Sequence, residues 1–272
     1  MTDTLFNITG KTAAVTGGGG IICGSMARDL AARGAKVAVL DLVEEAAEKV
    51  AASIRDAGGE AIAVKCNVLE LESIEAACKQ VEEAFGPVDI LVNGAGGNKK
   101  EATTSDDMSF FDIPADALRF VIDLNLLGSV LPSQVIGKRM AERDEGVIIN
   151  ISSMNSFTPL TKIIGYSAAK AAINNFTQWL AVHMAQNYSK NVRVNAIAPG
   201  FFETAQNKFL LREEDGSLTP RGQQIVDHTP MARYGEPGDL LGALVWLVSP
   251  ASKFVSGIVV PVDGGFSAYS GV

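Results

Sequence analysis

Short runs of β-branched and other apolar residues alternate with longer amphipathic stretches along most of this chain. Seven of these runs are typical of buried strands: residues 12–16, 36–40, 61–66, 90–93, 147–151, 192–197 and 258–262. Between most of them, apolar residues recur every three or four positions. In 44–57 and 70–85 this spacing predicts helices, which we expect to stop at Gly58 and Gly86.

The alternation of strands and helices predicts a parallel sheet, because parallel neighbours are joined by crossover helices. The strands are almost continuously apolar, as expected when helices cover both faces of a sheet. No linker divides the chain, so we expect residues 1–272 to form one α/β domain, doubly wound and Rossmann-type, with a parallel sheet of about seven strands. Pro261 places the last strand near the sheet edge. Residues 201–234 are polar and predict a substrate lid of helices and loops.

Composition and charge narrow the class of protein. The chain has 272 residues, of which 47% are hydrophobic and 20% charged, which is typical of a globular protein. Its 23 basic and 31 acidic residues give a net charge of −8, and no basic stripe is visible, so nucleic acid is not an expected partner.

The cysteines and the apolar runs bear on location. Cys23, Cys66 and Cys78 are odd in number and lack metal-ligand spacing, which argues against a disulfide framework and a zinc site and favours a reducing cytoplasm. His183 and His228 have no metal-ligand partners at helical spacing, so no metal is expected. No signal peptide is visible and no run approaches the length of a membrane span, so we expect no membrane association.

A glycine-rich segment, TGGGGIICG at residues 16–24, follows the first predicted strand and precedes a helical pattern. Glycines there let the backbone approach a pyrophosphate, and the helix directs its free N–H groups at the phosphates. By itself the segment could equally be a flexible turn. Asp41 ends the next strand, where a carboxylate meets ribose hydroxyls and repels a 2′-phosphate, which favours NAD(H) over NADP(H). Alternatively, Asp41 only provides an N-terminal charge for the following helix.

Tyr166 and Lys170 give the strongest catalytic signal. They lie four residues apart on a helical pattern, and Ser153 precedes the tyrosine at a strand end. Chance would produce only about 0.013 such triples in a chain of this composition. An ammonium beside a tyrosine favours the phenolate, so we expect Lys170 to lower the Tyr166 pKa and the Ser153 hydroxyl to hold a substrate oxygen. Lys170 alone would suggest only a solvated helix face.

Together with NGAG at 93–96, Asn125, YSAAK at 166–170 and APG at 198–200, these motifs resemble the short-chain dehydrogenase/reductase family from Gly10 onward. The resemblance implies that Tyr166 moves the proton, Lys170 binds the nicotinamide ribose, Ser153 polarises the carbonyl and Asn125 holds a relay water. It also implies a homotetramer. The implied cofactor contacts are Gly17, Gly19, Gly20, Ile21, Ile22, Asp41, Asn67, Val68, Asn93, Gly94, Ala95, Gly96, Tyr166, Lys170, Pro199, Gly200, Phe201, Phe202 and Thr204.

Two departures from the family pattern concern the cofactor. Ile21 and Cys23 occupy positions where the family has glycines, which leaves the path of the loop open. Asn67 stands where the family often has an aspartate near the adenine amino group, and its amide oxygen can accept the same hydrogen bond.

The chain resembles more closely a bacterial group of this family that interconverts D-mannonate and D-fructuronate. This resemblance lies in four variable segments: GFFETAQNKFLL at 200–211, DGSLTPRG at 215–222, DHTPMARYG at 227–235 and SPASKFVSGIVVPVDGGFSAYSGV at 249–272. A sugar acid needs a cation and several polar groups near the reactive carbon, although a solvated surface charge is the default for any one basic residue. The candidates are Asn98, Lys99, Lys100, Asn155, Gln206, Asn207, Arg212 and Arg221. Alternatives are a polyol, gluconate-type or 3-oxoacyl reductase, or a non-catalytic NAD-sensing protein. Trp179 and Phe176 are expected to be core or subunit-interface anchors.

Overall fold

The computed structural model describes residues 4–203 and 211–271. Its centre is one parallel sheet of seven strands in the order β3-β2-β1-β4-β5-β6-β7. The strands are β1 (Thr12–Thr16), β2 (Lys36–Asp41), β3 (Glu60–Lys65), β4 (Ile90–Asn93), β5 (Gly146–Ile151), β6 (Val192–Pro199) and β7 (Val259–Val262). The predicted single doubly wound α/β domain is confirmed.

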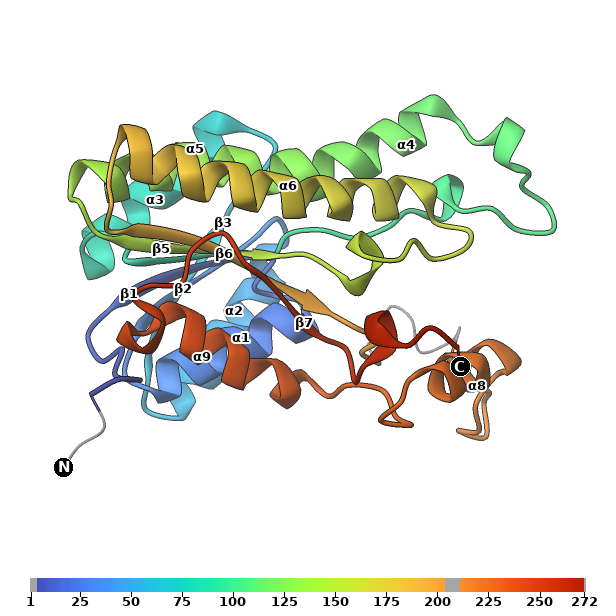
Figure 1. Ribbon diagram of the computed structural model, residues 1–272. Helices are drawn as coiled ribbons and strands as arrows, with labels where there is room; N and C mark the ends of the chain where they lie inside the picture. Colours follow the sequence, from blue (N-terminus) through green and yellow to red (C-terminus); the bar gives the residue numbers. More distant parts are fainter. Residues whose placement is uncertain (1–3, 204–210, 272) are drawn as a thin grey trace.

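Helices cover both faces of this sheet (Figure 1). One layer contains α1 (Ile21–Ala32), α2 (Glu44–Asp56) and α9 (Leu241–Val248), and the other contains α3 (Leu71–Phe85), α5 (Gly128–Glu142) and α6 (Ile164–Asn187). Each layer buries its own apolar cluster against the strands. The strands are therefore enclosed on both sides, as their continuous apolar runs predict.

The strand order reverses direction next to β1, because β2 and β4 lie on its two sides. In open α/β sheets, this switch point opens a crevice at the carboxyl ends of the strands, where ligands bind. The glycine-rich segment follows β1, and the NGAG segment begins at the last residue of β4, so both border the crevice.

The predicted element ends agree closely with the structure. Gly58 and Gly86 have φ angles of 85° and 83°, the left-handed conformation that glycine adopts most readily after a helix. The strand β6 continues to Pro199, two residues beyond the prediction, because Ala198 and Pro199 pair with Pro261 and Val262 of β7. β7 is the edge strand, as Pro261 predicts.

A long helical stretch, Ala115–Glu142, is apolar enough for its length to cross a membrane, and 44% of its most apolar window is buried inside the molecule. It consists of α4 (Ala115–Ile122), a π-helical turn at Asp123–Leu127, and α5. Its Val121, Asn125 and Ile136 are buried. Ile136 belongs to the apolar cluster that this helix layer forms against the sheet.

The described part of the predicted lid contains α8 (Pro220–His228) and two isolated bridges, Phe202 with Gly235 and Arg212 with Leu218. No longer strand occurs among the described residues of this segment, in agreement with its polar composition. Thr204, Gln206 and Asn207, three expected ligand contacts, lie outside the described residues.

Candidate active site

The structure brings the predicted catalytic side chains together at the carboxyl end of the sheet. Ser153 follows β5, Tyr166 and Lys170 lie on α6, and Asn125 lies in the π-helical turn. The Nζ of Lys170 donates a hydrogen bond of 2.8 Å to the carbonyl of Ile151 and lies 5.5 Å from the centroid of the Tyr166 ring. The carbonyl of Ile151, the last residue of β5, therefore holds the lysine beside the tyrosine.

Burial sets the protonation of this pair. Burial lowers the pKa of Lys170 to about 8, because the ammonium loses its hydration. Burial also raises the pKa of Tyr166 above its usual value, and the hydrogen bond with Ser153 offsets only part of this effect. The expected lowering of the Tyr166 pKa by Lys170 is thus wrong for this structure, because desolvation of the phenolate is the largest effect on this group.

The side chain of Asn125 holds the chain that follows β4. Its Oδ1 accepts a 3.1 Å hydrogen bond from Gly97 N, and its Nδ2 donates to the carbonyls of Gly97 and Val121, both at 2.7 Å. A Cβ on Gly96 would lie 2.7 Å from Asn125 Oδ1 and 3.3 Å from Lys170 Nζ. Glycine at position 96 therefore keeps open the space beside the lysine.

A buried amide network supports the same edge. Asn93 donates from Nδ2 to Ser133 Oγ and to Asn150 Oδ1, each at 2.9 Å, and Asn150 donates to Thr177 on α6. These bonds join β4, β5, α5 and α6 in the interior and fix the relative position of the elements, while the Asn93 Oδ1 has no partner among the described residues. Asn93 thus supports the central sheet from the end of β4.

The glycine-rich loop packs closely against neighbouring segments at the end of the sheet, although its glycine pattern departs from that of the family. A Cβ on Gly17 would lie 2.9 Å from Ala95 backbone atoms, and one on Gly18 would lie 2.7 Å from the Val39 side chain. Gly20 precedes the first residue of α1, so the N-terminus of this helix opens next to the loop. The loop provides the close backbone approach and the helix N-terminus that a pyrophosphate requires.

Ile21 and Cys23, the two residues that stand where the family has glycines, have different environments. Ile21 is 45% exposed in the first turn of α1, whereas Cys23 is buried. A Cβ on Gly94 would come within 2.1 Å of the Cys23 Sγ, so the thiol fills the space beside this glycine. Burial raises the pKa of Cys23 to about 12, which keeps the thiol neutral.

The carboxylate of Asp41 faces the loop. Its Oδ2 accepts a 3.0 Å hydrogen bond from Gly19 N, and its Oδ1 accepts one of 3.0 Å from Val43 N. Val43 is the N-cap residue of α2, so the Asp41 carboxylate also lies at the start of this helix, as the alternative role requires. Asp41 is held where a dinucleotide ribose would approach the glycine loop.

The remaining adenine and nicotinamide contacts are partly committed to the fold. The Asn67 Oδ1 accepts from Leu69 N at 3.1 Å, which leaves this oxygen one further lone pair for an adenine amino group. A Cβ on Gly200 would lie 2.6 Å from the Asp263 Cα, and Phe201 packs edge-on against Phe266 at 5.2 Å. The segment after β6 thus packs closely on the C-terminal segment.

The proposed carboxylate anchors have different local environments. Lys99 lies 5.4 Å from the centroid of the Phe120 ring, and Lys100 is exposed in a short 3₁₀ helix. Arg212 is paired with Glu203 at 2.6 Å, and Arg221 lies half-buried on α8. The Asn98 side chain donates to Thr103 Oγ1. Among the described candidates, Arg212 is thus already engaged by a carboxylate of the chain itself.

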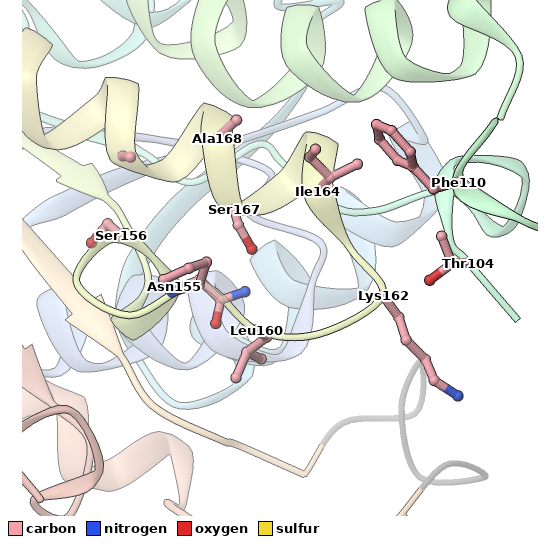
Figure 2. Close-up of a pocket in the computed structure, with 11 residues that line it drawn as sticks. Thr104, Phe110, Asn155, Ser156, Leu160, Lys162, Ile164, Ser167 and Ala168 are labelled. Atoms are coloured by element: carbon pink, nitrogen blue, oxygen red, sulfur yellow. The ribbon is translucent and has the colours of Figure 1, made fainter. Parts of the chain in front are cut away.

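A cavity of about 520 Å³ lies against the N-terminal half of α6 (Figure 2). Its lining includes the predicted substrate residue Asn155 and also Lys162, which sequence reasoning missed. Lys162 has a φ of 76°, unusual for a residue with a side chain. A lone lysine in a polar loop gives no pattern that could have identified it. Its neighbours become evident only in the folded chain.

The two histidines have aromatic neighbours. His183 stacks on Trp179 with ring centroids 4.5 Å apart, and His228 lies 4.6 Å from the Phe266 ring. Within residues 4–203 and 211–271, no group of three His, Cys, Asp or Glu side chains could hold a metal ion. Phe176 packs against the buried cluster of α3, α5 and α6, as expected for a core anchor, whereas Trp179 is 56% exposed.

Known proteins share the sequence and the fold of this chain. The family model described as short chain dehydrogenase matches residues 11–215. A Haemophilus influenza structure with bound NAD, provisionally named a D-mannonate oxidoreductase, is 51% identical, covers 98% of both chains and superposes with a TM-score of 0.91. The 5-keto-D-gluconate 5-reductase of Escherichia coli strain K12 is 36% identical over 96% of this chain and 97% of its own. A Burkholderia cenocepacia gluconate 5-dehydrogenase in complex with NADP and tartrate is 31% identical over 98% of both chains, with a TM-score of 0.86.

Proposed function

Because this chain belongs to the short-chain dehydrogenase family and is an oxidoreductase acting on alcohol or keto groups, we propose that its substrate is a sugar acid. The reaction moves hydride reversibly between NAD(H) and a secondary alcohol or ketone, with D-mannonate and D-fructuronate as the preferred pair. The observation that carries the proposal is the convergence of Ser153, Tyr166 and Lys170 at the carboxyl end of the sheet. A protein that only sensed NAD would have no chemical need for this set.

The residues of the chain suit a bound nicotinamide dinucleotide. The loop after β1 has room only for glycine at Gly17 and Gly18, and the Asp41 carboxylate is aligned beside it. When bound, the nicotinamide supplies or accepts the hydride at the substrate carbon. Lys170 lies beside Tyr166 and Gly96, where its Nζ would bind the nicotinamide ribose.

Proton transfer falls to Tyr166. In the direction of reduction its neutral hydroxyl donates the proton to the substrate oxygen, and burial favours this neutral form. The Ser153 hydroxyl, which hydrogen-bonds with Tyr166, holds the same oxygen and polarises the carbonyl. Asn125, which fixes the backbone of Gly97, also holds the relay water in this proposal.

A preference for NAD(H) over NADP(H) follows from Asp41. Its carboxylate would lie against the 2′-phosphate of NADP, and the like charges repel. The Haemophilus structure with NAD supports this preference, whereas the Burkholderia relative is described with NADP. We therefore assign the preference to the local carboxylate and not to the family as a whole.

A second candidate function is a gluconate-type reductase of the same family. The Escherichia coli and Burkholderia relatives favour it, since both names refer to gluconate chemistry. The higher identity to the provisional D-mannonate oxidoreductase, 51% against 36% and 31%, favours the mannonate pair. The variable segments of the sequence also resemble the mannonate group.

We further propose a homotetramer, by family resemblance, and a cytoplasmic location, supported by three buried free cysteines.

The test is NADH oxidation against a panel of ketones: D-fructuronate, 5-keto-D-gluconate, an uncharged ketohexose and a 3-oxoacyl thioester. The proposal predicts the highest kcat/KM with D-fructuronate. Highest activity with 5-keto-D-gluconate would select the second candidate function. If only the thioester or the uncharged ketose were reduced, the sugar-acid proposal would be wrong.

A further inference from the structure

The cavity of about 520 Å³ beside α6 has two buried polar atoms that the catalytic mechanism does not use. The Asn155 Oδ1 and the Ser167 Oγ both belong to lining residues, which are 3% and 6% exposed. Neither atom has a hydrogen-bond partner among the described residues. In Figure 2 the two side chains point toward each other from the loop after β5 and from α6.

Leaving such groups unpaired in a buried position costs roughly 1 to 3 kcal/mol each. The native fold therefore gains if a ligand supplies the missing hydrogen bonds. The amide oxygen of Asn155 needs a donor, and the hydroxyl of Ser167 can donate or accept. A ligand hydroxyl group meets both needs, because it donates and accepts at once, whereas a hydrocarbon meets neither.

The other lining residues indicate which further groups the ligand would have. Apolar side chains, among them Leu160 and Ile164, provide surfaces for C–H groups. Lys162 is the one charged side chain among the described residues that line the cavity. Its backbone is held in the left-handed region at φ 76°, and its carbonyl accepts a 2.9 Å hydrogen bond from Thr104 N. In Figure 2 its ammonium extends from the rim, away from Asn155 and Ser167.

None of Ser153, Tyr166 and Lys170 lines the cavity, but two of its lining residues neighbour these residues along the chain. Asn155 donates from its backbone N to the Ser153 Oγ at 3.3 Å, while its side chain lines the cavity. Ser167 directly follows Tyr166 on α6. A substrate whose carbonyl lies at Ser153 and Tyr166 could therefore extend its remaining carbons into this cavity.

We propose that the cavity takes the hydroxylated chain of the substrate, with its hydroxyls on Asn155 and Ser167 and its carboxylate at Lys162. This assignment rests on the proposed sugar-acid function and makes it more specific. Asn155, Ser167 and Lys162 become the residues that select a long hydroxylated acid over a short ketone. Lys162 is preferred over the earlier candidate Arg212 as the carboxylate partner, because Arg212 is already paired with Glu203.

Three ketones separate these roles. D-Fructuronate has the hydroxylated chain and the carboxylate, D-fructose has the chain without the carboxylate, and dihydroxyacetone has neither. Ser167→Ala should lower kcat/KM about 2- to 10-fold on the first two and leave the third within about twofold, the range for one neutral hydrogen bond. Lys162→Met should lower it about tenfold or more on D-fructuronate alone, since the lost partner is charged.

Two controls keep the result interpretable. Lys190→Met removes the same charge just beyond the opposite end of α6 and should leave all three ketones unchanged. Ser167→Ala removes an unpaired buried hydroxyl, so its Tm should not fall. NADH affinity should be the same in every variant.

Losses within about twofold, or equal losses on all three ketones, would overturn the assignment while the reduction of D-fructuronate by the wild type leaves the proposed function intact. If the wild type reduced no sugar acid, the proposed function would fail, and this assignment would fail with it. A loss confined to Lys162→Met, with Ser167→Ala unchanged, would contradict the hydroxyl-binding pair.

Discussion

Two ionisable side chains, Tyr166 and Lys170, share the buried catalytic centre, and burial favours the neutral form of each. This arrangement makes the tyrosine a ready proton donor and the lysine a group that gains or loses its charge near pH 8. Neither property could be predicted from the four-residue spacing. The spacing gives a shared helix face, whereas the pKa values depend on what the fold places around it.

Tyr166→Phe should remove the transferred proton and leave the ring in place. We expect kcat to fall by about 10² to 10⁴, the usual contribution of a positioned general acid, while NADH affinity is retained. Steady-state kinetics measures the fall in kcat, and a cofactor titration measures the NADH affinity. Turnover above about a tenth of the wild-type value would show that another group donates the proton.

The depressed pKa of Lys170 also links stability to pH. In the unfolded chain this lysine titrates near 10.5 and in the folded protein at about 8. Between these values the unfolded chain binds more protons, so the contribution of Lys170 to stability is full above the higher pKa and is lost as the pH falls to the lower one. Charging this buried group is therefore unfavourable to the fold.

Lys170→Met abolishes this titration. Relative to the wild type, the variant should be less stable at about pH 9.5 than at about pH 7.5, its free energy of unfolding being lower by about 2 kcal/mol, because only the wild type gains stability as Lys170 loses its proton. Urea unfolding of both proteins at the two pH values measures the difference, and the buried cysteines titrate in both. A difference that is independent of pH would contradict the account of this lysine.

Asp41→Ala tests the cofactor preference at a single side chain. The wild type should have the higher kcat/KM with NADH, and removal of the carboxylate should narrow the gap to NADPH because the repulsion is gone. Kinetics with both cofactors give the ratio. An equal or higher wild-type efficiency with NADPH would contradict the role given to Asp41.

At the scale of elements, the start of α1 and the end of β4 pack against each other through Cys23 and Gly94. Gly94→Ala would drive a methyl group into the thiol, and such overpacking costs about 1 to 3 kcal/mol. Cys23→Ala should create space, so the double variant should recover part of the loss. Unfolding free energies of the four proteins give this coupling, and strict additivity would contradict the contact.

The elements themselves could be predicted well from the sequence. Apolar runs located all seven strands, because strands that helices cover on both faces need apolar side chains at nearly every position. The end of β6 was missed because its last two residues are ordered by pairing with β7, which the local pattern does not contain. The cavity was missed for a similar reason, since Asn155 and Ser167 meet only when α6 packs on the loop after β5.

At the scale of the whole molecule, the net charge of −8 opposes an acidic substrate, whereas the proposed site relies on a local cation. If the local cation dominates, kcat/KM for D-fructuronate should fall as salt screens the attraction, and that for D-fructose should stay constant. A series of ionic strengths up to about 0.5 M measures this dependence. If kcat/KM for D-fructuronate instead rose with ionic strength, the overall negative charge of the protein would govern the approach of this substrate.

The central claim, hydride transfer from NADH to the carbonyl of a sugar acid, is tested most directly by following the hydride. NADH with deuterium at the transferred position of C4 is incubated with D-fructuronate, and the product is analysed by mass spectrometry and NMR. The account predicts D-mannonate with deuterium on the carbon of the new hydroxyl group, formed far more slowly by Tyr166→Phe. Oxidation of NADH without labelled product, or labelled product formed equally fast by Tyr166→Phe, would contradict it.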